Sequence, residues 1–468
     1  MPDLRKKIFL ESGKTVSRKA RSRPESTRGS PGNSPVTSRN GSRATSRANS
    51  RYGSEEEDLT ESEYDDSVAS SIINSDDGED VVAATWPDRL HFRMEALIDR
   101  KRSSAKGRES TLTAYTHIIR HHYAAEYVES RFSELIPALL KSIRSSSNTD
   151  ETLAALKALA MTVLSIQSET VYGHVYSTLK GVCDDSEEAS IKVGAIEAMC
   201  ITTMCGGGSL AEAEELMEYL LEIIESDGHS IGAGDNGSVV SAALAGWGFV
   251  ATNLEDLYDQ SELALDAFTE QLDSTDVDVQ IAAGTNIALI FEAAREHEEE
   301  TEEPWNVHYD HHKLLQRMIA LAKESSKSIS KKNRKHLHAS FNSVLTSLEL
   351  GKGPGYSTAR RMGNPHTGGN KSDMSQDYKE FGYREKIRLH NISMVIDSWS
   401  LSARLEMLKH IVGGGLADQY MENPTIKDLL STAQVEFVSA PKGKRNDTSK
   451  NGRGKQTSRG KNSDDTDY

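Results

Sequence analysis

The sequence predicts an all-α protein whose central part is a solenoid of stacked helix pairs, followed by a small C-terminal unit. Two observations lead to this prediction. Apolar residues recur at spacings of three and four through the middle of the chain, and similar helical segments return about forty residues apart. In addition, almost no alternating β pattern interrupts the stretch from about residue 86 to residue 350. The fold expected for this stretch is therefore helical throughout.

The first 85 residues are expected to be disordered. Residues 1–53 form an arm with 13 basic and 3 acidic residues in which Ser-Arg dipeptides recur, and residues 54–80 form a spacer with 12 acidic and no basic residues. Such segments bury too little apolar surface to offset the entropy lost on ordering. The arm is either a solvated tail or a phosphorylatable segment that contacts RNA or a partner. The spacer either folds back on the arm or serves as a solvating linker.

Helical order is expected to begin near Trp86, with Pro87 at the first helical position. The periodic segments predict helices over 87–103, 107–130, 131–145, 150–167, 171–184, 187–204, 209–226, 236–252, 261–273, 277–297, 309–326 and 332–349. Between the helices over 277–297 and 309–326, an acidic loop is expected over 297–310.

A repeat underlies these helices. Residues 155–160 resemble residues 195–200, and residues 242–247 resemble residues 282–287, each pair at an offset of 40. A period near 40 with paired helices is typical of armadillo and HEAT solenoids. The domain expected over 86–350 is of this kind, and such stacks offer an extended groove to protein partners rather than a catalytic pocket.

The remainder of the chain changes character. Residues 351–383 are rich in Gly, Asn and Ser and are expected to form a linker, and residues 439–468 are expected to form a disordered basic tail. Between them, the unit over 384–438 shows two short β-like runs around His390-Asn391. It also predicts a helix over 400–412 capped by Asp397 and ended by glycines, then a short helix from Pro424.

Charge is segregated along the chain. The total is -16, but residues 81–310 hold 15 basic and 40 acidic residues, whereas residues 311–438 hold 19 basic and 12 acidic residues. A basic segment can dock on nucleic acid even in an acidic protein. The alternative is an ordinary solvated helix start with scattered charges. The candidate phosphate-contacting residues are Lys331, Lys332, Arg334, Lys335, Arg384, Lys386, Arg388 and Arg404.

Other chemistries find little support. Three Cys exclude a disulfide framework and fit a reducing compartment, and the apolar runs are too short to predict a membrane span. His308 and His312 have the spacing of helix ligands, but the sequence contains neither HExxH nor CxxC, so no metal is expected. Phosphate-loop and nucleophile-elbow patterns are also missing. We therefore expect no catalytic residues, no cofactor and no small-molecule substrate.

The C-terminal unit resembles the interferon-related developmental regulator family. The residues that carry the resemblance are 386–389, the block Asp397-Ser398-Trp399-Ser400 with the two residues before it, Leu408, 413–415, Asn423-Pro424 and Leu429. Residues 86–350 also look like the helical domain of that family. Within the block, Trp399 either stacks on a base or peptide or packs as a structural staple.

Members of that family are described as transcriptional co-regulators, and some bind non-translating ribosomes with C-terminal elements where mRNA and tRNA would lie. The resemblance implies a non-enzymatic regulator that binds ribosomes or ribosomal RNA and restrains translation, in the cytoplasm and also in the nucleus. The alternative that it implies is a nuclear transcriptional co-regulator acting through protein contacts on the solenoid.

Overall fold

The computed structural model describes residues 56–58, 85–101, 103–145, 148–166, 168–254, 256–305, 309–324, 329–362 and 378–437. Its contacts divide the chain into two units, Met1–Gly53 and Ser54–Tyr468, and every described residue belongs to the second. The Ser-Arg arm, residues 59–84 of the N-terminal part, and the tail after residue 437 lie outside the described residues, as does His308.

The body is helical, as the periodicity predicts. Its helices are α2 (Trp86–Ile98), α3 (Ala105–His121), α4 (Ala125–Glu129), α5 (Phe132–Ile143), α6 (Thr149–Ser165), α7 (Val171–Asp185), α8 (Ala189–Cys205), α9 (Leu210–Glu225), α10 (Gly237–Ala251), α11 (Tyr258–Gln271), α12 (Val277–Thr301), α13 (His311–Ala322) and α14 (Lys331–Leu350). A short 3-10 turn, η4 (His229–Ile231), precedes α10.

Several boundaries differ from the expectation. Helix α2 ends at Ile98 and α13 at Ala322, five and four residues before the expected ends. The expected helix over 107–130 is broken at residues 122–124 into α3 and α4. Helix α12 continues to Thr301, into the expected acidic loop, where Glu302 ends it with a left-handed φ of 58°. Glu has good helix propensity, so an acidic run continues a helix that is already nucleated.

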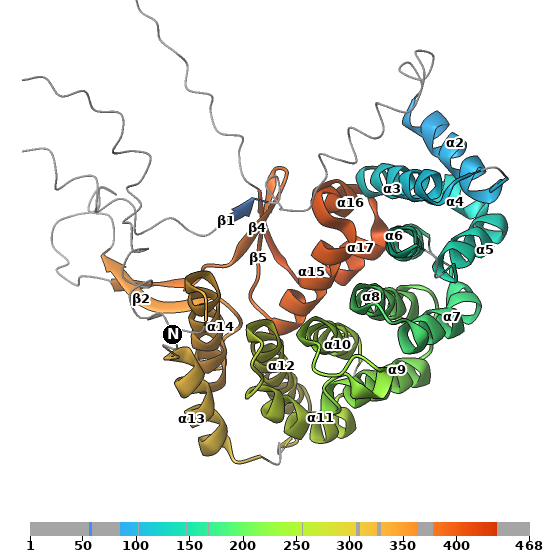
Figure 1. Ribbon diagram of the computed structural model, residues 1–468. Helices are drawn as coiled ribbons and strands as arrows, with labels where there is room; N and C mark the ends of the chain where they lie inside the picture. Colours follow the sequence, from blue (N-terminus) through green and yellow to red (C-terminus); the bar gives the residue numbers. More distant parts are fainter. Residues whose placement is uncertain are drawn as a thin grey trace, which may run out of the picture. The chain divides into compact units, whose positions relative to one another are not determined.

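The helices stack in two rows. Helix pairs α5/α6, α7/α8, α9/α10, α11/α12 and α13/α14 pack side by side, and α3, α6, α8, α10, α12 and α14 contact one another in that order as an inner row (Figure 1). The repeat lies in this row, because the equivalent alanines Ala155, Ala195, Ala243 and Ala283 are all fully buried. Gly246 shows how close the helices come: a Cβ there would lie 2.8 Å from the Sγ of Cys200.

By length and composition alone, helix α12 is long enough and apolar enough to cross a membrane. However, 61% of its most apolar stretch is buried within the protein, where α12 packs between α10 and α14. Burial among other helices is the arrangement of a solenoid core helix.

The C-terminal residues form a small sheet and three helices. Strands β4 (Lys386–Leu389) and β5 (Ile392–Val395) make a hairpin, β6 (Gln434–Phe437) pairs with β5, and β1 (Glu56–Asp58) pairs in parallel with β4. His390 takes a left-handed φ of 51° in the hairpin turn. Helix α15 (Trp399–Val412), the 3-10 turn η5 (Gly413–Gly415), α16 (Leu416–Glu422) and α17 (Pro424–Leu429) follow.

We call α15 to α17, with η5, the C-terminal strap. It is not an independent unit, because α15 packs against α6, α10 and α12, while α16 packs against α3 and α17 against α6 (Figure 1). Leu401, Leu405 and Leu408 belong to the same hydrophobic cluster as the inner row. The strap therefore covers the inner helices of the solenoid.

Two local expectations are corrected. Ser398, not Asp397, caps α15, because the Ser398 Oγ accepts a hydrogen bond from the Leu401 N–H at 3.1 Å. The expected linker over 351–383 contains an antiparallel ribbon of β2 (Tyr356–Met362) and β3 (Tyr378–Tyr383). The linker was expected from the Gly- and Asn-rich centre of that stretch. The aromatic residues at its two ends favour strands.

Candidate nucleic-acid interface

The first predicted basic cluster lies at the start of α14. Ser330 caps this helix, and the side chains of Lys331, Lys332 and Lys335 are exposed. Arg334 is half-buried and donates a hydrogen bond to the carbonyl oxygen of Ile329 at 3.1 Å. Cations at a helix N-terminus oppose the helix dipole, at a cost of about 0.3–1 kcal/mol each. A bound anion would remove this cost, so the cluster is better suited to a phosphate ligand than to stability.

The second predicted group lies on other elements. Arg384 stands at the base of the β2–β3 ribbon, where Gly355 accepts its N–H and donates to Ser343 in the second half of α14, whereas Lys386 and Arg388 lie in strand β4. Strand β4 alternates buried Ile387 and Leu389 with half-buried Lys386 and Arg388, which therefore lie on the opposite face of the sheet. The sequence-predicted surface is thus two basic patches rather than one.

The contacts of the second group are local. The Nζ of Lys386 lies 3.2 Å from a carboxylate oxygen of Glu436, and Nε of Arg388 lies 3.4 Å from the carbonyl oxygen of His390. Strand β1 places Glu56 and Asp58 at the register positions of Lys386 and Arg388. This short part of the acidic spacer accordingly pairs with a basic strand.

Arg404 is half-buried, and its guanidinium bonds to neighbouring elements of the same chain. Its guanidinium donates to the Oγ1 of Thr252 at 3.0 Å, to the carbonyl oxygen of Thr252, and to that of Leu429 at 3.3 Å. Burial lowers the pKa of this group, with Asp428 acting in the opposite direction. Arg404 therefore joins α15 to the end of α10, and we leave it out of the candidate interface.

The block around Trp399, which carries the resemblance in the sequence, has a structural role as well. The Trp399 side chain is buried, and its Nε1–H donates to the Oγ of Ser347 at 2.7 Å. Glu292 of α12 accepts hydrogen bonds from the backbone N–H groups of Trp399 and Ser400 at 2.9 and 3.0 Å. Asp397 is half-buried, which raises its pKa. Of the two roles considered for Trp399, the structure supports the staple.

The strap also satisfies backbone carbonyls at the ends of inner helices. Gln419 donates to Ile119 of α3 at 2.8 Å, and Asn423 donates to Leu164 of α6 at 2.9 Å. The last carbonyls of a helix have no partner within the helix, so each bond caps an inner helix. Because the strap covers these helices, this side of the solenoid is not an open groove for a partner.

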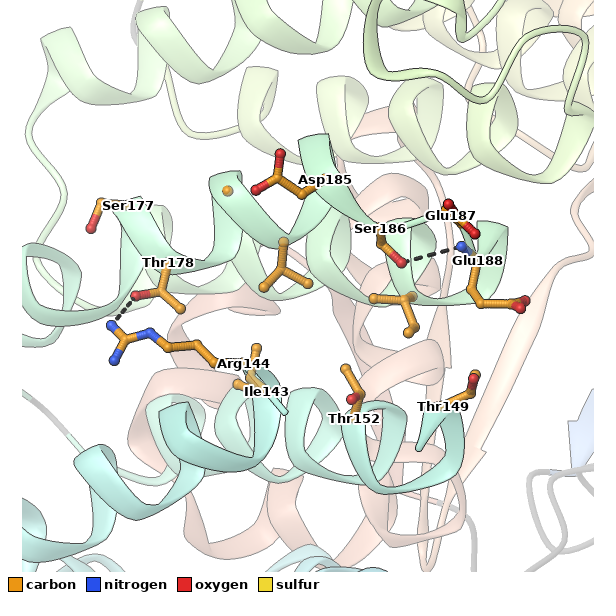
Figure 2. Close-up of a pocket in the computed structure, with 13 residues that line it drawn as sticks. Ile143, Arg144, Thr149, Thr152, Ser177, Thr178, Asp185, Ser186, Glu187 and Glu188 are labelled. Carbon is orange, nitrogen blue, oxygen red and sulfur yellow. Dashed lines mark hydrogen bonds between the residues drawn. The ribbon is translucent and has the colours of Figure 1, made fainter. Parts of the chain in front are cut away.

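A polar pocket opens between the α5/α6 and α7/α8 pairs (Figure 2). It has a volume of about 800 Å³ and is lined by hydroxyl groups, by the acids Asp185, Glu187 and Glu188, and by Arg144, whose guanidinium donates to the Thr178 Oγ1 at 2.7 Å. None of its lining residues is a His, Cys or Lys. The pocket therefore offers hydroxyl groups, three carboxylates and one guanidinium for polar contacts.

Groups that could support other chemistry are dispersed or buried. In the described part of the chain, His, Cys, Asp and Glu do not gather in threes that could hold a metal ion. Burial raises the pKa of the Cys183 thiol to about 11 and that of Cys205 to about 12, and Cys200 shifts in the same direction. Such thiols stay protonated; Cys183 and Cys200 are small core residues, and Cys205 is half-buried against the core.

The sequence reasoning missed an aromatic and basic group on the ribbon. Tyr356 and Phe381 lie there beside Lys352 and Arg384, and only Arg384 stands among the candidates above. The signal was present in the aromatic residues at both ends of the presumed linker.

Comparisons with known proteins agree with the resemblance in the sequence. The family model described as interferon-related developmental regulator matches residues 49–349, a stretch that begins near the end of the Ser-Arg arm and ends in the last turn of α14. An uncharacterised protein of Schizosaccharomyces pombe is 27% identical over 360 residues, covering 74% of each chain. Interferon-related developmental regulator 1 of Sus scrofa is 22% identical over 78% of this chain and 77% of its own length.

Interferon-related developmental regulator 2 of Mus musculus is also 22% identical, over 78% of each chain. The matched stretch covers well over half of the 468 residues and includes the whole helical body. The chain therefore belongs to the interferon-related developmental regulator family.

Proposed function

We propose that this protein is a non-enzymatic regulator that binds ribosomes or ribosomal RNA and restrains translation. The observation that carries the proposal is the exposed cluster Lys331, Lys332 and Lys335 at the start of α14, on a protein whose helices before it are strongly acidic. Lysines that neutralise phosphates gain free energy by releasing counterions. Binding would act by exclusion, since a protein on the RNA surface blocks other ligands there.

The experiment is co-sedimentation of the full-length protein with purified ribosomes over a range of salt concentrations. Changing Lys331, Lys332 and Lys335 to Glu should weaken binding and lower the slope of log K against log salt by about one for each lost phosphate contact. The matched control changes Lys106, Lys141 and Lys180 to Glu, since these are exposed lysines on α3, α5 and α7 with the same change in charge. Equal binding and slope for the two triple variants would contradict the proposal.

The second candidate is a nuclear transcriptional co-regulator that binds proteins on the solenoid. The relatives above are named developmental regulators, which fits either role. Because the strap covers the inner helices, such a partner would use the outer helices, for example the polar pocket between α5/α6 and α7/α8. Affinity purification from lysate with and without RNase separates the two: ribosomal proteins lost on RNase treatment favour the first, and a nuclear complex that survives it favours the second.

A further inference from the structure

The β2–β3 ribbon is a separate two-stranded sheet with a fixed base. Its strands do not pair with the four-stranded sheet, and a bulge places Thr358 and Ala359 opposite Phe381. At the base, the Gly355 N–H donates to the Oγ of Ser343 on α14 at 2.8 Å, and the Arg384 N–H donates to the carbonyl oxygen of Gly355 at 3.2 Å. The ribbon therefore starts from a rigid point on the last turns of α14.

Aromatic rings gather where the ribbon leaves this base. Tyr356 and Tyr383 are cross-strand partners whose ring centroids lie 5.1 Å apart, edge to face. Phe381 follows on the same strand, and all three side chains are only half-buried. Rings that served only as core would be covered by neighbouring elements, whereas these keep exposed surface at the edge of the protein.

Cations lie beside the same rings. The Lys352 Nζ lies 5.7 Å from the centre of the Tyr356 ring, and Cζ of Arg384 lies 5.2 Å from the centre of the Phe381 ring. The acids nearby are Glu380, which accepts a hydrogen bond from the Tyr356 hydroxyl at 2.9 Å, and the exposed Glu385. The segments 352–362 and 378–388 together carry seven basic and two acidic residues, unlike the acidic helical body.

We propose that the β2–β3 ribbon is a binding site for single-stranded RNA, with bases stacked on Phe381, Tyr356 and the guanidinium of Arg384. Rings alternating with cations match a strand that alternates flat bases and phosphates, and such stacking tolerates many base sequences. An acidic peptide would pair with the cations but would offer no flat bases to stack on the aromatic rings. The proposal rests on the proposed function only in taking RNA as the nucleic acid, and its site is distinct from the cluster at the start of α14.

The test measures fluorescence anisotropy of the full-length protein with a labelled oligoadenylate of about 12 nucleotides and with an abasic strand of the same length. The wild type should bind the oligoadenylate about tenfold more tightly than the abasic strand. Phe381→Ala should remove most of this preference while leaving the salt dependence unchanged, because no charge is altered. Arg384→Lys keeps the charge but loses the planar stacking group, and it should weaken binding by a smaller factor.

Two further variants keep the result decisive. Phe381→Trp restores a large ring and should retain or tighten binding, so its failure would overturn the stacking role even if Phe381→Ala disturbs the ribbon. Phe92→Ala is the matched control, because Phe92 on α2 is 53% exposed and has Arg93 5.5 Å from its ring centre. Equal binding of the two strands by the wild type, or an equal loss in Phe92→Ala, would also overturn the proposal.

The ribosome assay separates this inference from the proposed function. Preference for bases over the abasic strand without ribosome co-sedimentation would support the ribbon site and contradict the ribosomal role. The opposite result is co-sedimentation that depends on Lys331, Lys332 and Lys335 but no preference for the oligoadenylate over the abasic strand. It would support the ribosomal role and contradict the ribbon site.

Discussion

The helical body and the C-terminal strap are held in place by different forces. The body packs through apolar side chains in a repeating pattern, with Ala155, Ala195, Ala243 and Ala283 buried at equivalent positions. The strap also buries leucines, but it is oriented by polar side chains that bond to backbone groups of other helices. Apolar packing tolerates small shifts, whereas buried hydrogen bonds do not, because an unpaired polar group costs about 1–3 kcal/mol.

This difference shows that the strap caps the C-terminal ends of helices in the solenoid. The last carbonyl groups of each helix have no partner within the helix and must bond to something else. Here, one segment far along the chain supplies hydrogen-bond donors to the ends of α3, α6 and α10 in turn. The strap and body should therefore unfold as one cooperative unit, which the following variants test.

The largest effect is expected from Trp399→Ala. Truncating a buried Trp typically costs about 3–5 kcal/mol, and here it also leaves the Ser347 hydroxyl without its donor. Thermal unfolding should shift to lower temperature, and hydrogen exchange should become faster in α15 and in α12 together. Faster exchange in α15 alone would show that the strap is an independent unit.

A pH effect is expected from Glu292, the carboxylate that caps α15. Burial raises its pKa to about 7. The N–H groups of Trp399 and Ser400 and the charge of Arg295 act to lower the pKa, and the charge of Glu296 acts to raise it. Because the pKa in the folded protein exceeds the ordinary 4.5, the stabilisation by this group is complete below pH 4.5 and is lost as the pH rises through 7.

Glu292→Gln removes this titration and keeps one oxygen as an acceptor, although the two N–H groups bond to different oxygens of the carboxylate. The change in unfolding free energy between pH 4.5 and a pH above 7 should become smaller by on the order of 3 kcal/mol, measured by urea denaturation. His410, whose pKa is raised by its hydrogen bond to Glu197, titrates with the same sign and remains in the variant. An unchanged pH dependence would mean that Glu292 does not titrate in this window.

A smaller effect is expected from Asn423→Ala. This change leaves the buried carbonyl of Leu164 without the Asn423 donor, which should cost about 1–3 kcal/mol, and it also removes the cap of α17 and the bond to Gln419. The matched control is Asn342→Ala, since Asn342 is exposed on α14 and donates only to the carbonyl oxygen of His338 within its own helix. The control should change stability by less than about 0.5 kcal/mol. Equal losses in the two variants would remove the distinction between strap and body.

Much of the body was predictable because the helical period is a local property. The breaks and the repeat could be found from residues a few positions apart. The fixed φ of proline located the short helix at Pro424 and, to within one residue, the start of α2, which begins at Trp86 rather than Pro87. The cap of α15 was misplaced by one residue, since Asp397 and Ser398 are both good caps and only the backbone distinguishes them.

The candidate interface was predictable only in part. Charge segregation located the Lys331 cluster, but composition could not separate it from Arg404, which carries the same charge but is half-buried and bonds to Thr252. The ribbon was missed because its strands lie on either side of a Gly- and Asn-rich stretch, and their pairing depends on closing that connection.

The sequence by itself determined the helical class, the period near forty, the family resemblance and the basic character of the C-terminal part, all of which depend on neighbouring residues or on composition. Only the tertiary structure decided that the strap covers the inner helices, that Trp399 is a staple and that the basic residues form two patches. The bond between Gln419 and Ile119 joins residues 300 positions apart. Such pairings follow from how the whole chain packs, because the energy of a buried polar group depends on which partner the fold brings to it.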